Sequence, residues 1–589
     1  MMIRKRILCT VLLLSLQALP LLADSGTWTN GSADGRWDTA ANWSGVAPPA
    51  NGETATFDGS DGNSVPTAGT GEPGAGSTVH FTFASGFTSA VALGADFYTA
   101  GGAVGTVTIE DASANITLGL DVTGDVYVYP GGAVTCGANR AIAGAVTLIG
   151  SGGADEAKLE VSAGTTTVAG VIDLQVNGYL SVASGAILDA NGGITISELG
   201  AYIGNDGTIA GIINAGDYTV SYSSAGTIVV DVAGTLDLGT TVANEQTVDI
   251  AAGAGTVTIG NDFLCDGLDA SSGSIAGGGK TITVGSGGLD WGAATLDAAG
   301  TLNVEVAAGE TTIVLKTSDA VASRLGTLTV SGTATASGVL YASKFAGAGI
   351  LHLNGQNLLV RTTSNDFWTF SGTLDGTGAV AFPYYEESSI ENNTAITIGG
   401  TIDVTVCPGG NGVTVTQKAA LSVGGILYVR TLSGTAGHVG MLIMSGAPLT
   451  VTGNTLLGLT DRAGGLTLAG GQANTFGGTI ARNGEATANT LTLAGRVAFG
   501  GNVTLAGMTA DFGTARIDTG AVAITGTTAT AISNAGAIVT GRSGAVTFTD
   551  LDTNWTAGNP AIFARRWTDG GGNGVRVKSL APHWMTGLR

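Results

Sequence analysis

The chain has 589 residues, of which 98 are glycine and only 6% are aromatic. Glycine at about two and a half times its average frequency disfavours helices, because it destabilises a helix interior by about 1 kcal/mol relative to alanine. The formal net charge is −22, and beyond the amino terminus Lys and Arg are scattered except for Arg565 and Arg566. Nucleic acid and anionic lipid are therefore poor partners, because binding them requires a basic patch.

The first 23 residues have the features of an export signal. Arg4, Lys5 and Arg6 precede an apolar run over residues 7–16, and the small residue Ala23 offers a cleavage point. A membrane-spanning helix needs about 20 apolar residues, and this stretch is broken by polar residues and proline. We therefore expect residues 1–23 to be a signal peptide and the mature chain to have no membrane-spanning segment. The protein is expected to be secreted or held at the cell surface.

Residues 24–100 begin with a tryptophan-rich stretch. Three of the eight tryptophans, Trp28, Trp37 and Trp43, lie in it, surrounded by Gly, Asn, Asp and Pro. A helix would place apolar residues about every three or four positions, whereas this stretch has turn-forming residues at almost every step. We expect residues 24–100 to form an amino-terminal Trp-rich cap and an irregular β segment.

Residues 101–550 carry a short repeated block, Gly-Thr-apolar-x-apolar. Its period-two alternation gives one apolar face and one Thr, Asp or Asn face, which is typical of a half-buried strand. Intervals near 21, 26 and 45 residues recur between blocks. A solenoid with about 20–25 residues per turn would space its blocks in this way. The blocks are GTVTI at Gly105, GTIVV at Gly226, GTLDL at Gly234, GTVTI at Gly255, GTLNV at Gly300, GTLTV at Gly326 and GTIDV at Gly400.

Two architectures compete for this pattern. An antiparallel sandwich or barrel would show a hairpin turn about every 8–12 residues and aromatic residues closing its core, but this chain is poor in aromatics. A solenoid stacks short parallel strands around a narrow interior of Val, Leu, Ile and Ala, with Gly and Asn at the corners. We therefore expect an all-β parallel β-helix, or β-solenoid, over residues 101–550 and a carboxy-terminal cap over residues 551–589.

The stretch GGLTLAGGQANTFGGTI, residues 464–480, resembles the autotransporter-associated β-strand repeat of bacterial exported proteins. The opening tryptophan stretch is similar to the start of large exported proteins that carry such repeats. The resemblance implies a right-handed parallel β-helix displayed outside the cell. No translocating outer-membrane barrel follows the repeats, so we expect a passenger-like protein without it. The matching repeat residues are Leu466, Thr467, Leu468, Asn474, Thr475, Phe476, Gly477, Gly478 and Thr479, and those of the opening stretch are Trp28, Trp37, Asn42, Trp43, Pro48 and Phe57.

The tryptophans admit two interpretations. A solenoid exposes an apolar stack at each end and must cover it, so Trp28, Trp37 and Trp43 would cap the first turn. Alternatively, these three residues contact carbohydrate, since an indole can stack on a sugar ring and keep its N–H as a polar handle. Capping is preferred, because large aromatic side chains are usually buried. The tryptophans expected to cap the other end are Trp555, Trp567 and Trp584.

The sequence offers no ligand set for a metal or a cofactor, and we expect neither. Cys136, Cys265 and Cys407 lie more than a hundred residues from one another, which argues against a disulfide framework. Each adjoins an apolar run and is expected to be a small buried thiol. The four histidines lack ligand-like neighbours at short spacing.

No catalytic constellation is recognised either, so we do not expect an enzyme. Glu386 and Glu387 are adjacent, so on a strand they would point to opposite faces, and we interpret them as part of a solvated loop. His438 lies in AGHVG, which is similar to the Gly-His-Gly of polygalacturonase-like hydrolases, but the companion elements of that family are absent. The stretch GTGEPG, residues 69–74, lacks the flanking strand and helix of a dinucleotide site.

These features together predict an exported, non-catalytic protein with a structural or adhesive role. Its outward strand positions are mostly Thr, Ser, Asp and Asn, which can form many weak hydrogen bonds with a hydroxyl-rich polymer. We therefore expect cell-surface or matrix polysaccharide as the partner. The alternative is a polysaccharide-binding or polysaccharide-degrading β-helix protein of the lyase or hydrolase kind. The sequence leaves the oligomeric state open.

Overall fold

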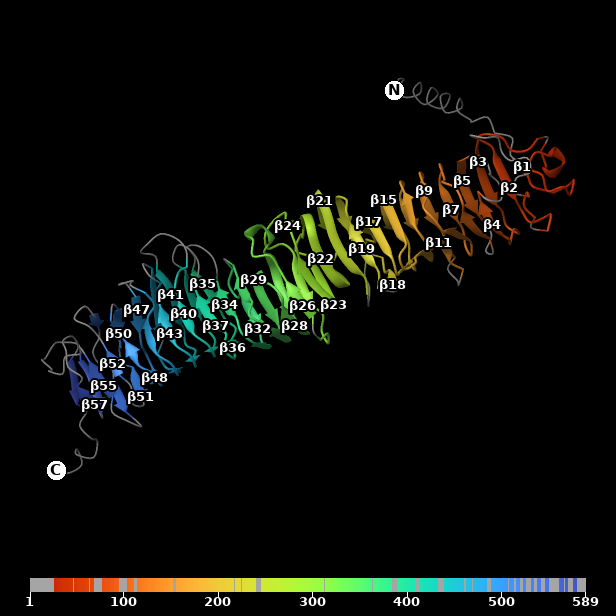
Figure 1. The fold of residues 1–589 in the computed structure, drawn as a ribbon. Helices are drawn as coiled ribbons and strands as arrows, with labels where there is room; N and C mark the ends of the chain where they lie inside the picture. Colours follow the sequence, from red (N-terminus) through yellow and green to blue (C-terminus); the bar gives the residue numbers. More distant parts are fainter. Residues whose placement is uncertain are drawn as a thin grey trace, which may run out of the picture. The chain divides into compact units, whose positions relative to one another are not determined.

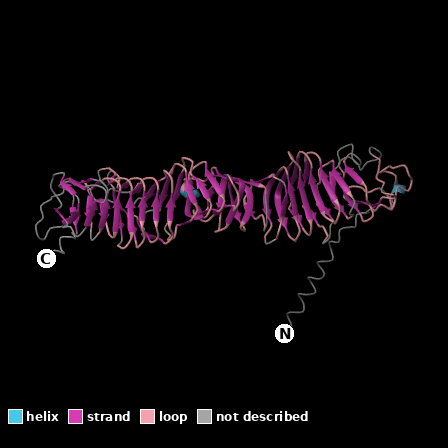
Figure 2. Ribbon diagram, turned by 90° about the horizontal axis from the view of Figure 1, so that it is seen from below, coloured by secondary structure: helices cyan, strands magenta, loops and turns pink. Residues whose placement is uncertain are grey.

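The computed structural model places short strands side by side, with turns and loops at the corners between them (Figures 1 and 2). The expected signal peptide, residues 1–23, lies outside the described residues, and from residue 526 onward only the backbone of strands is described. The described residues are 26–45, 47–62, 64–67, 77–94, 103–110, 114–151, 155–216, 218–223, 225–239, 245–311, 313–362, 364–383, 389–407, 413–432, 439–459, 462–468, 470–484, 489–506, 508–512, 515–519, 523–525, 531–533, 538–541, 546–549, 561–565, 567–569 and 576–579.

The chain divides into two compact units. Unit 1 comprises Met1–Gly267 with Ser272–Ile275, and unit 2 comprises Leu268–Ser271 with Ala276–Arg589. Each is a parallel β-solenoid, and the fold has about 18 turns in all, with about 1% of residues in helices. Among the described residues, the helical segments are two short 3-10 helices, η1 (Ala40–Asn42) and η2 (Val321–Ser323). The expected all-β parallel solenoid is therefore confirmed.

In unit 1 the strands of successive turns form three parallel ladders. The first is a seven-stranded sheet of β4 (Ala90–Leu93), β6 (Asn115–Leu118), β8 (Ala133–Cys136), β11 (Ala157–Val161), β14 (Gly178–Val182), β16 (Tyr202–Asn205) and β18 (Ser221–Ser223). The second contains β1 (Gly26–Thr27), β2 (Thr54–Phe57), β3 (Thr78–Phe83), β5 (Ala103–Ile109), β7 (Val126–Val128), β10 (Val146–Leu148) and β13 (Ile172–Leu174). The third contains β9 (Arg140–Ile142), β12 (Thr165–Val168) and β19 (Thr227–Val230).

Some longer strands of unit 1 turn a corner without a break and join two ladders. Strand β15 pairs with β12 through residues 187–190 and with β13 through residues 194–196. Parallel pairing also includes β1, β2 and β3, so strand stacking already operates inside the expected cap segment. The other strands of this unit are β15 (Ile187–Ile196), β17 (Thr208–Asn214), β20 (Gly234–Leu236), β21 (Thr247–Ile259) and β22 (Phe263–Ala276), whose last residues belong partly to unit 2.

Unit 2 repeats the arrangement with its own ladders. Its seven-stranded sheet contains β35 (Ser389–Asn392), β38 (Thr414–Gln417), β41 (Val439–Met444), β44 (Ala463–Leu468), β47 (Asn489–Thr492), β50 (Met508–Asp511) and β53 (Ala531–Ser533). Its nine-stranded sheet contains β36 (Ile396–Ile398), β39 (Leu421–Val423), β42 (Leu449–Val451), β45 (Ala473–Phe476), β48 (Arg496–Phe499), β51 (Arg516–Thr519), β54 (Ile538–Gly541), β56 (Ala561–Arg565) and β58 (Arg576–Ser579).

The remaining strands of unit 2 complete its turns. The ladder beside these two sheets contains β31 (Asn357–Val360), β34 (Ala379–Phe382), β37 (Asp403–Val406), β40 (Leu427–Val429), β43 (Thr455–Leu457), β46 (Ile480–Arg482), β49 (Val503–Thr504), β52 (Ala523–Thr525), β55 (Val546–Thr549) and β57 (Trp567–Asp569). The early turns contain β23 (Thr281–Trp291), β24 (Thr295–Leu296), β25 (Asn303–Val306), β26 (Ile313–Lys316), β27 (Leu325–Val330), β28 (Thr333–Ala336), β29 (Leu340–Gly347), β30 (Ile350–His352), β32 (Trp368–Phe370) and β33 (Thr373–Asp375).

The core of each unit is a column of aliphatic side chains inside the turns. Alternate residues of a strand point inward, so β3 alternates between partly exposed Thr or His and fully buried Val79, Phe81 and Phe83. All seven Gly-Thr blocks overlap a strand, as the alternation predicts. In the repeat-like stretch of residues 464–480, the Leu-Thr-Leu and Asn-Thr-Phe steps fall on β44 and β45, and the Thr-Ile step leads into β46, which begins at Ile480.

Side-chain amides and carboxylates tie neighbouring turns together. Asp121 Oδ1 accepts the N–H of Ala141 at 2.8 Å across 20 residues, and Asn139 Oδ1 accepts that of Thr165 at 2.9 Å across 26 residues. Inside the stack, Asn205 Nδ2 donates to Gln246 Oε1 at 2.7 Å. These bonds satisfy backbone N–H groups of β9 and β12 and a buried polar group inside the stack. Turn length therefore varies while the stacking continues.

Candidate functional site

The tryptophan cap, residues 26–45, is the first candidate site because it contains the three indoles predicted to cap the first turn or bind carbohydrate. Strand β1 leads into Trp28, which pairs with Trp43 in an antiparallel bridge. Thr27 N–H donates to Ser44 Oγ at 2.9 Å, and Thr27 O accepts the N–H of Ser44 at 2.8 Å. The cap segment thereby pairs with the outer edge of the first strand, which would otherwise invite pairing with another chain.

The three indole rings pack against one another and onto the next turns. The Trp43 ring centroid lies 5.1 Å from that of Trp28 and 4.6 Å from that of Trp37, both in edge-to-face geometry. Phe57 of β2 lies 6.0 Å from Trp43, and Phe81 of β3 lies 6.3 Å from Trp37. Edge-to-face contacts of this kind are favourable beyond simple burial. The rings thus continue the apolar column of unit 1 and close its amino-terminal end.

The burial of these rings bears on the predicted carbohydrate contact. Trp28, Trp37 and Trp43 are 1%, 3% and 4% exposed, whereas stacking on a sugar requires an open ring face. Two of the indole N–H groups also have partners within the chain: Trp43 Nε1 donates to Trp37 O at 2.8 Å, and Trp28 Nε1 donates to Ser64 Oγ at 3.1 Å. Contact between these residues and carbohydrate stays a prediction, and it would require the cap to open.

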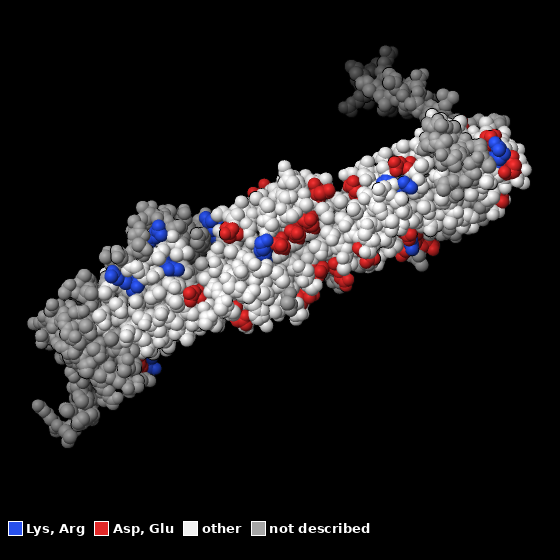
Figure 3. Space-filling view, viewed as in Figure 1, with Lys and Arg blue, Asp and Glu red and all other residues white. Residues whose placement is uncertain are grey.

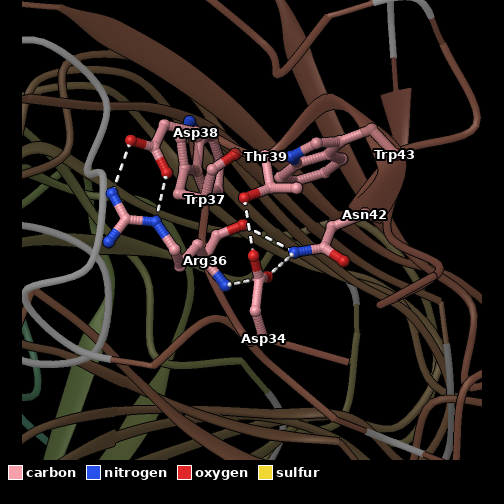
Figure 4. A network of polar contacts seen from close by, with 7 residues as sticks. All are labelled: Asp34, Arg36, Trp37, Asp38, Thr39, Asn42 and Trp43. Atoms are coloured by element: carbon pink, nitrogen blue, oxygen red, sulfur yellow. Dashed lines mark hydrogen bonds and ion pairs between the residues drawn. The ribbon is translucent and has the colours of Figure 1, made fainter. Parts of the chain in front are cut away.

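A polar frame around Asn42 holds the cap in shape (Figure 4). Asn42 is fully buried, and its Nδ2 donates to Asp34 Oδ1 at 2.6 Å and to Arg36 O at 2.9 Å. Its Oδ1 accepts from Ser32 N at 2.9 Å and Ser32 Oγ at 2.6 Å. All four hydrogen-bonding positions of this amide are therefore filled, as a buried amide requires.

Asp34 is the charged member of this frame. Its Oδ1 also accepts the N–H of Arg36 at 3.0 Å, and its Oδ2 accepts the hydroxyl of Thr39 at 2.9 Å. These hydrogen bonds, first that from the backbone N–H of Arg36, hold the pKa of Asp34 well below its ordinary value. Beside it, Arg36 and Asp38 form a solvent-exposed pair through two bonds of 2.9 and 2.7 Å. The charged groups of the frame therefore face outward, and its amide is fully used in hydrogen bonds within the cap.

The outer face of the unit 1 sheet gives a second candidate, which we name the tyrosine strip: Lys158, Tyr179 and Tyr202. These three outward residues pair directly across β11, β14 and β16. Lys158 Nζ lies 5.1 Å from the Tyr179 ring centroid, and the two tyrosine centroids are 4.8 Å apart. Sequence analysis missed the strip because its members are separated by whole turns. The only signal in the sequence is a polar-aromatic position recurring at about the turn length.

The three cysteines behave as the sequence predicted. Cys136, Cys265 and Cys407 are buried and free of disulfides. Burial raises the pKa of Cys136 to about 11 and raises the pKa of the other two thiols as well. A thiol held protonated inside the stack is a poor nucleophile and a poor metal ligand.

Two of the four histidines have described partners in neighbouring turns. His80 Nδ1 accepts the N–H of Thr106 at 2.9 Å. His352 of β30 pairs with Asp375 of β33, and both side chains are nearly half exposed. Among the described residues, no group of three or more His, Cys, Asp or Glu is arranged to hold a metal ion.

Several residues considered from the sequence lie outside the described residues. They include the predicted loop acids, the AGHVG histidine, the GTGEPG stretch and two of the carboxy-terminal tryptophans, while Trp567 belongs to β57, where only the backbone is described. The carboxy-terminal cap over residues 551–589 therefore stays a prediction. The residues and stretch concerned are Glu386, Glu387, His438, 69–74, Trp555 and Trp584.

Comparison with known proteins adds no family assignment. No protein-family model matches the chain, and no match is found among curated proteins. The resemblance to the autotransporter-associated repeat therefore rests on its own residues and stays a prediction. In the part of the chain that the structure describes, no helix is both long and apolar enough to cross a membrane.

Proposed function

We propose that this chain is an exported, non-catalytic protein that has a structural or adhesive role at the cell surface or in the extracellular matrix. The observation that carries the proposal is that the inward and outward faces of the stacked turns carry different kinds of side chain. Apolar side chains and the buried cysteines occupy the interior, whereas outward strand positions carry mainly small hydroxyl or amide side chains. Such a surface suits many weak contacts with a polymer better than one tight site.

The repeat resemblance supports export and surface display. Its first two steps fall on β44 and β45 and its third leads into β46, while its Gly-Gly step lies where turns approach closely. A Cβ on Gly477 would lie 2.6 Å from Thr452 O, and one on Gly478 would lie 2.4 Å from Gly453 O. Only glycine fits such a contact without a shift of the backbone. The motif is therefore used as a turn of a solenoid, which is how the resembled repeat is expected to be used.

Cell-surface or matrix polysaccharide is the partner that we propose. The alternative, a polysaccharide lyase or hydrolase, would require acids and bases gathered in one cleft. In the described residues, the carboxylates are dispersed over the surface of the face drawn in Figure 3 rather than gathered at one point. That distribution favours binding without cleavage.

The test is to incubate the purified mature chain with a panel of neutral and anionic polysaccharides. We expect retention of the protein on one or more of them and no change in the polymers. New reducing ends or unsaturated products, absent from a heat-denatured control, would contradict a non-catalytic role. Surface labelling of intact source cells, with a cytoplasmic protein as control, tests export in the same preparation.

A further inference from the structure

The outer face of the seven-stranded sheet of unit 1 carries small side chains except at one place. Its outward positions form two rows that cross all seven strands, and most of them are Ala, Asn, Thr, Ser or Gly. The large side chains, those of the tyrosine strip and Glu160, are gathered on three neighbouring strands. The rows are Ala90, Asn115, Ala133, Lys158, Tyr179, Tyr202 and Ser221, and Ala92, Thr117, Thr135, Glu160, Ser181, Gly204 and Ser223.

The two phenol rings lean together over Gly204. A Cβ built on this glycine would lie 3.1 Å from Tyr179 Oη and 3.5 Å from Tyr202 Cε1. A side chain at this position would crowd the Tyr179 hydroxyl, whereas its contact with the Tyr202 ring would have an ordinary van der Waals distance. Neither ring belongs to the core, because Tyr179 and Tyr202 lie on the outward side of their strands and are partly exposed. This arrangement differs from that of the cap indoles, which are almost fully buried.

The strip has a closed end and an open end. At the first, the ammonium group of Lys158 lies within cation–π range of the Tyr179 ring and is paired with Glu156 Oε2 at 3.0 Å. At the other, Tyr202 is followed in the same row by Ser221, which is small and exposed. The second row supplies hydroxyl groups on Ser181 and Ser223. An aromatic surface beside hydroxyls and one cation can contact the C–H groups of a sugar ring and hydrogen-bond its hydroxyls.

The charge of unit 1 limits which polymer can bind. Between residues 24 and 267 the sequence has 26 Asp and Glu but only three Lys and Arg. Residues 276–589, in contrast, have 18 Asp and Glu and 17 Lys and Arg. A polyanion would be repelled by such a surface, and neutral sugars would not. Glu160 lies in the strip's own neighbourhood, where its side chain accepts from Thr135 Oγ1 at 3.3 Å. The occupant that fits is therefore uncharged.

We propose that the tyrosine strip is a binding subsite for an uncharged, hydroxyl-rich polysaccharide that lies along the outer face of this sheet. The inference rests on the proposed function, and it adds the site and the class of polymer. Tyr179 and Tyr202 contact the sugar rings, while Lys158, Ser181 and Ser223 bind hydroxyl groups at their sides. The small residues Ser221 and Ser223, which continue the rows beyond Tyr202, leave room for the polysaccharide to extend past the open end of the strip.

The experiment measures binding of the mature chain to hydroxyethylcellulose, a soluble uncharged glucan, and to polygalacturonate by affinity electrophoresis. The test variant is Tyr179→Ala with Tyr202→Ala, and alanine is already tolerated in this row at Ala133. The matched control is Tyr127→Ala, which removes an outward tyrosine from β7 on another face. We expect the test variant to bind the glucan about tenfold more weakly or worse, because two ring contacts are lost. The control should bind as the unmodified chain does.

The outcomes separate this inference from the proposed function. Binding of the glucan by the unmodified chain with no loss in the test variant would overturn the strip and leave a polysaccharide partner in place. Preference for polygalacturonate would overturn the choice of an uncharged polymer. No binding of either polymer would overturn both the strip and the polysaccharide partner.

A second measurement needs no substitution and therefore does not depend on the folding of a variant. Tetranitromethane nitrates exposed tyrosines, and mass spectrometry locates them. The glucan should slow nitration of Tyr179 and Tyr202 and leave that of Tyr127 unchanged. Equal rates with and without glucan, under conditions where the glucan is bound, would contradict the proposal.

Discussion

The tryptophan cap and the tyrosine strip use aromatic side chains in opposite ways within the same unit. In the cap, three indoles are 1–4% exposed and form edge-to-face contacts with one another. In the strip, two phenols point outward from a sheet whose other outward residues are mostly small. The sequence makes the cap conspicuous, because its tryptophans are close together along the chain. The clustering of tryptophans along the sequence therefore identified the cap, which is a structural element. The tyrosine strip, the candidate binding surface, forms only when the turns stack.

Removing the cap should have the largest effect on the protein. Deleting residues 25–57 removes β1 and β2, so β3 keeps its pairing with β5 but loses its pairing with β2 and exposes an unpaired strand edge. We expect the truncated chain to aggregate, as measured by light scattering after gel filtration. A chain that starts at Ser25 is the control. If the truncated chain stayed monodisperse and equally resistant to denaturant, the cap would be a separate module.

A single tryptophan should separate the two regions by stability. Trp43→Ala removes a ring that contacts both other indoles and Phe57. We expect a loss of about 3–5 kcal/mol in the free energy of unfolding of the turns that it covers, as for other buried Trp-to-Ala changes. Tyr202→Ala should cost far less, because its ring is partly exposed. Urea unfolding, with amide hydrogen exchange as the readout for each region, measures the loss of stability in both variants. Equal losses in Trp43→Ala and Tyr202→Ala would contradict the difference between a buried cap and an exposed strip.

The buried amide of the cap allows a smaller and more specific test. Asn42→Ala leaves Ser32 N–H and the carbonyl of Arg36 without the partners that they have now. We expect a loss of roughly 1–3 kcal/mol, the usual cost of unpaired buried polar groups. Asn115→Ala, at an exposed position of β6, is the matched control and should change stability by less than about 0.5 kcal/mol. A neutral Asn42→Ala would mean that water replaces the amide.

The smallest expected effect is a pH dependence of the cap. The pKa of Asp34 is lowered in the folded chain, so its contribution is fully present above the unfolded pKa and is lost as pH falls through the folded value. Asp34→Asn should therefore be less stable than the unmodified chain near pH 7, and the difference should shrink below about pH 4. Thermal melts between pH 3 and 7 measure this difference. A constant difference across that range would show that the carboxylate contributes no charge-dependent stability.

The fold could be predicted from the sequence because strand alternation is local. In a block such as GTVTI at Gly105, the inward and outward residues follow from period two alone, and the structure places it in β5. Capping by the tryptophans was likewise predictable, since large rings beside turn residues have few places to be buried other than an end of the stack.

The pairing of turns could not be predicted, because it depends on the length of every corner. Inter-turn hydrogen bonds join residues 20 positions apart at Ala141 and 26 positions apart at Thr165. A change of one residue in a corner between Tyr179 and Tyr202 would move Tyr202 away from Tyr179 or turn it inward. The partnership of His352 with Asp375 was missed for the same reason. The local alternation of a strand thus specifies which of its residues point inward or outward. Only the folded stack of turns specifies which residues of different turns are neighbours.

Hydrogen exchange of the mature chain with and without hydroxyethylcellulose tests the contrast between cap and strip most directly. We predict that bound glucan slows exchange in peptides covering β14 and β16, residues 178–205, and leaves exchange in peptides covering the cap, residues 26–45, unchanged. Slower exchange in the cap, with no change at β14 and β16, would contradict the account and make the tryptophans the carbohydrate contact.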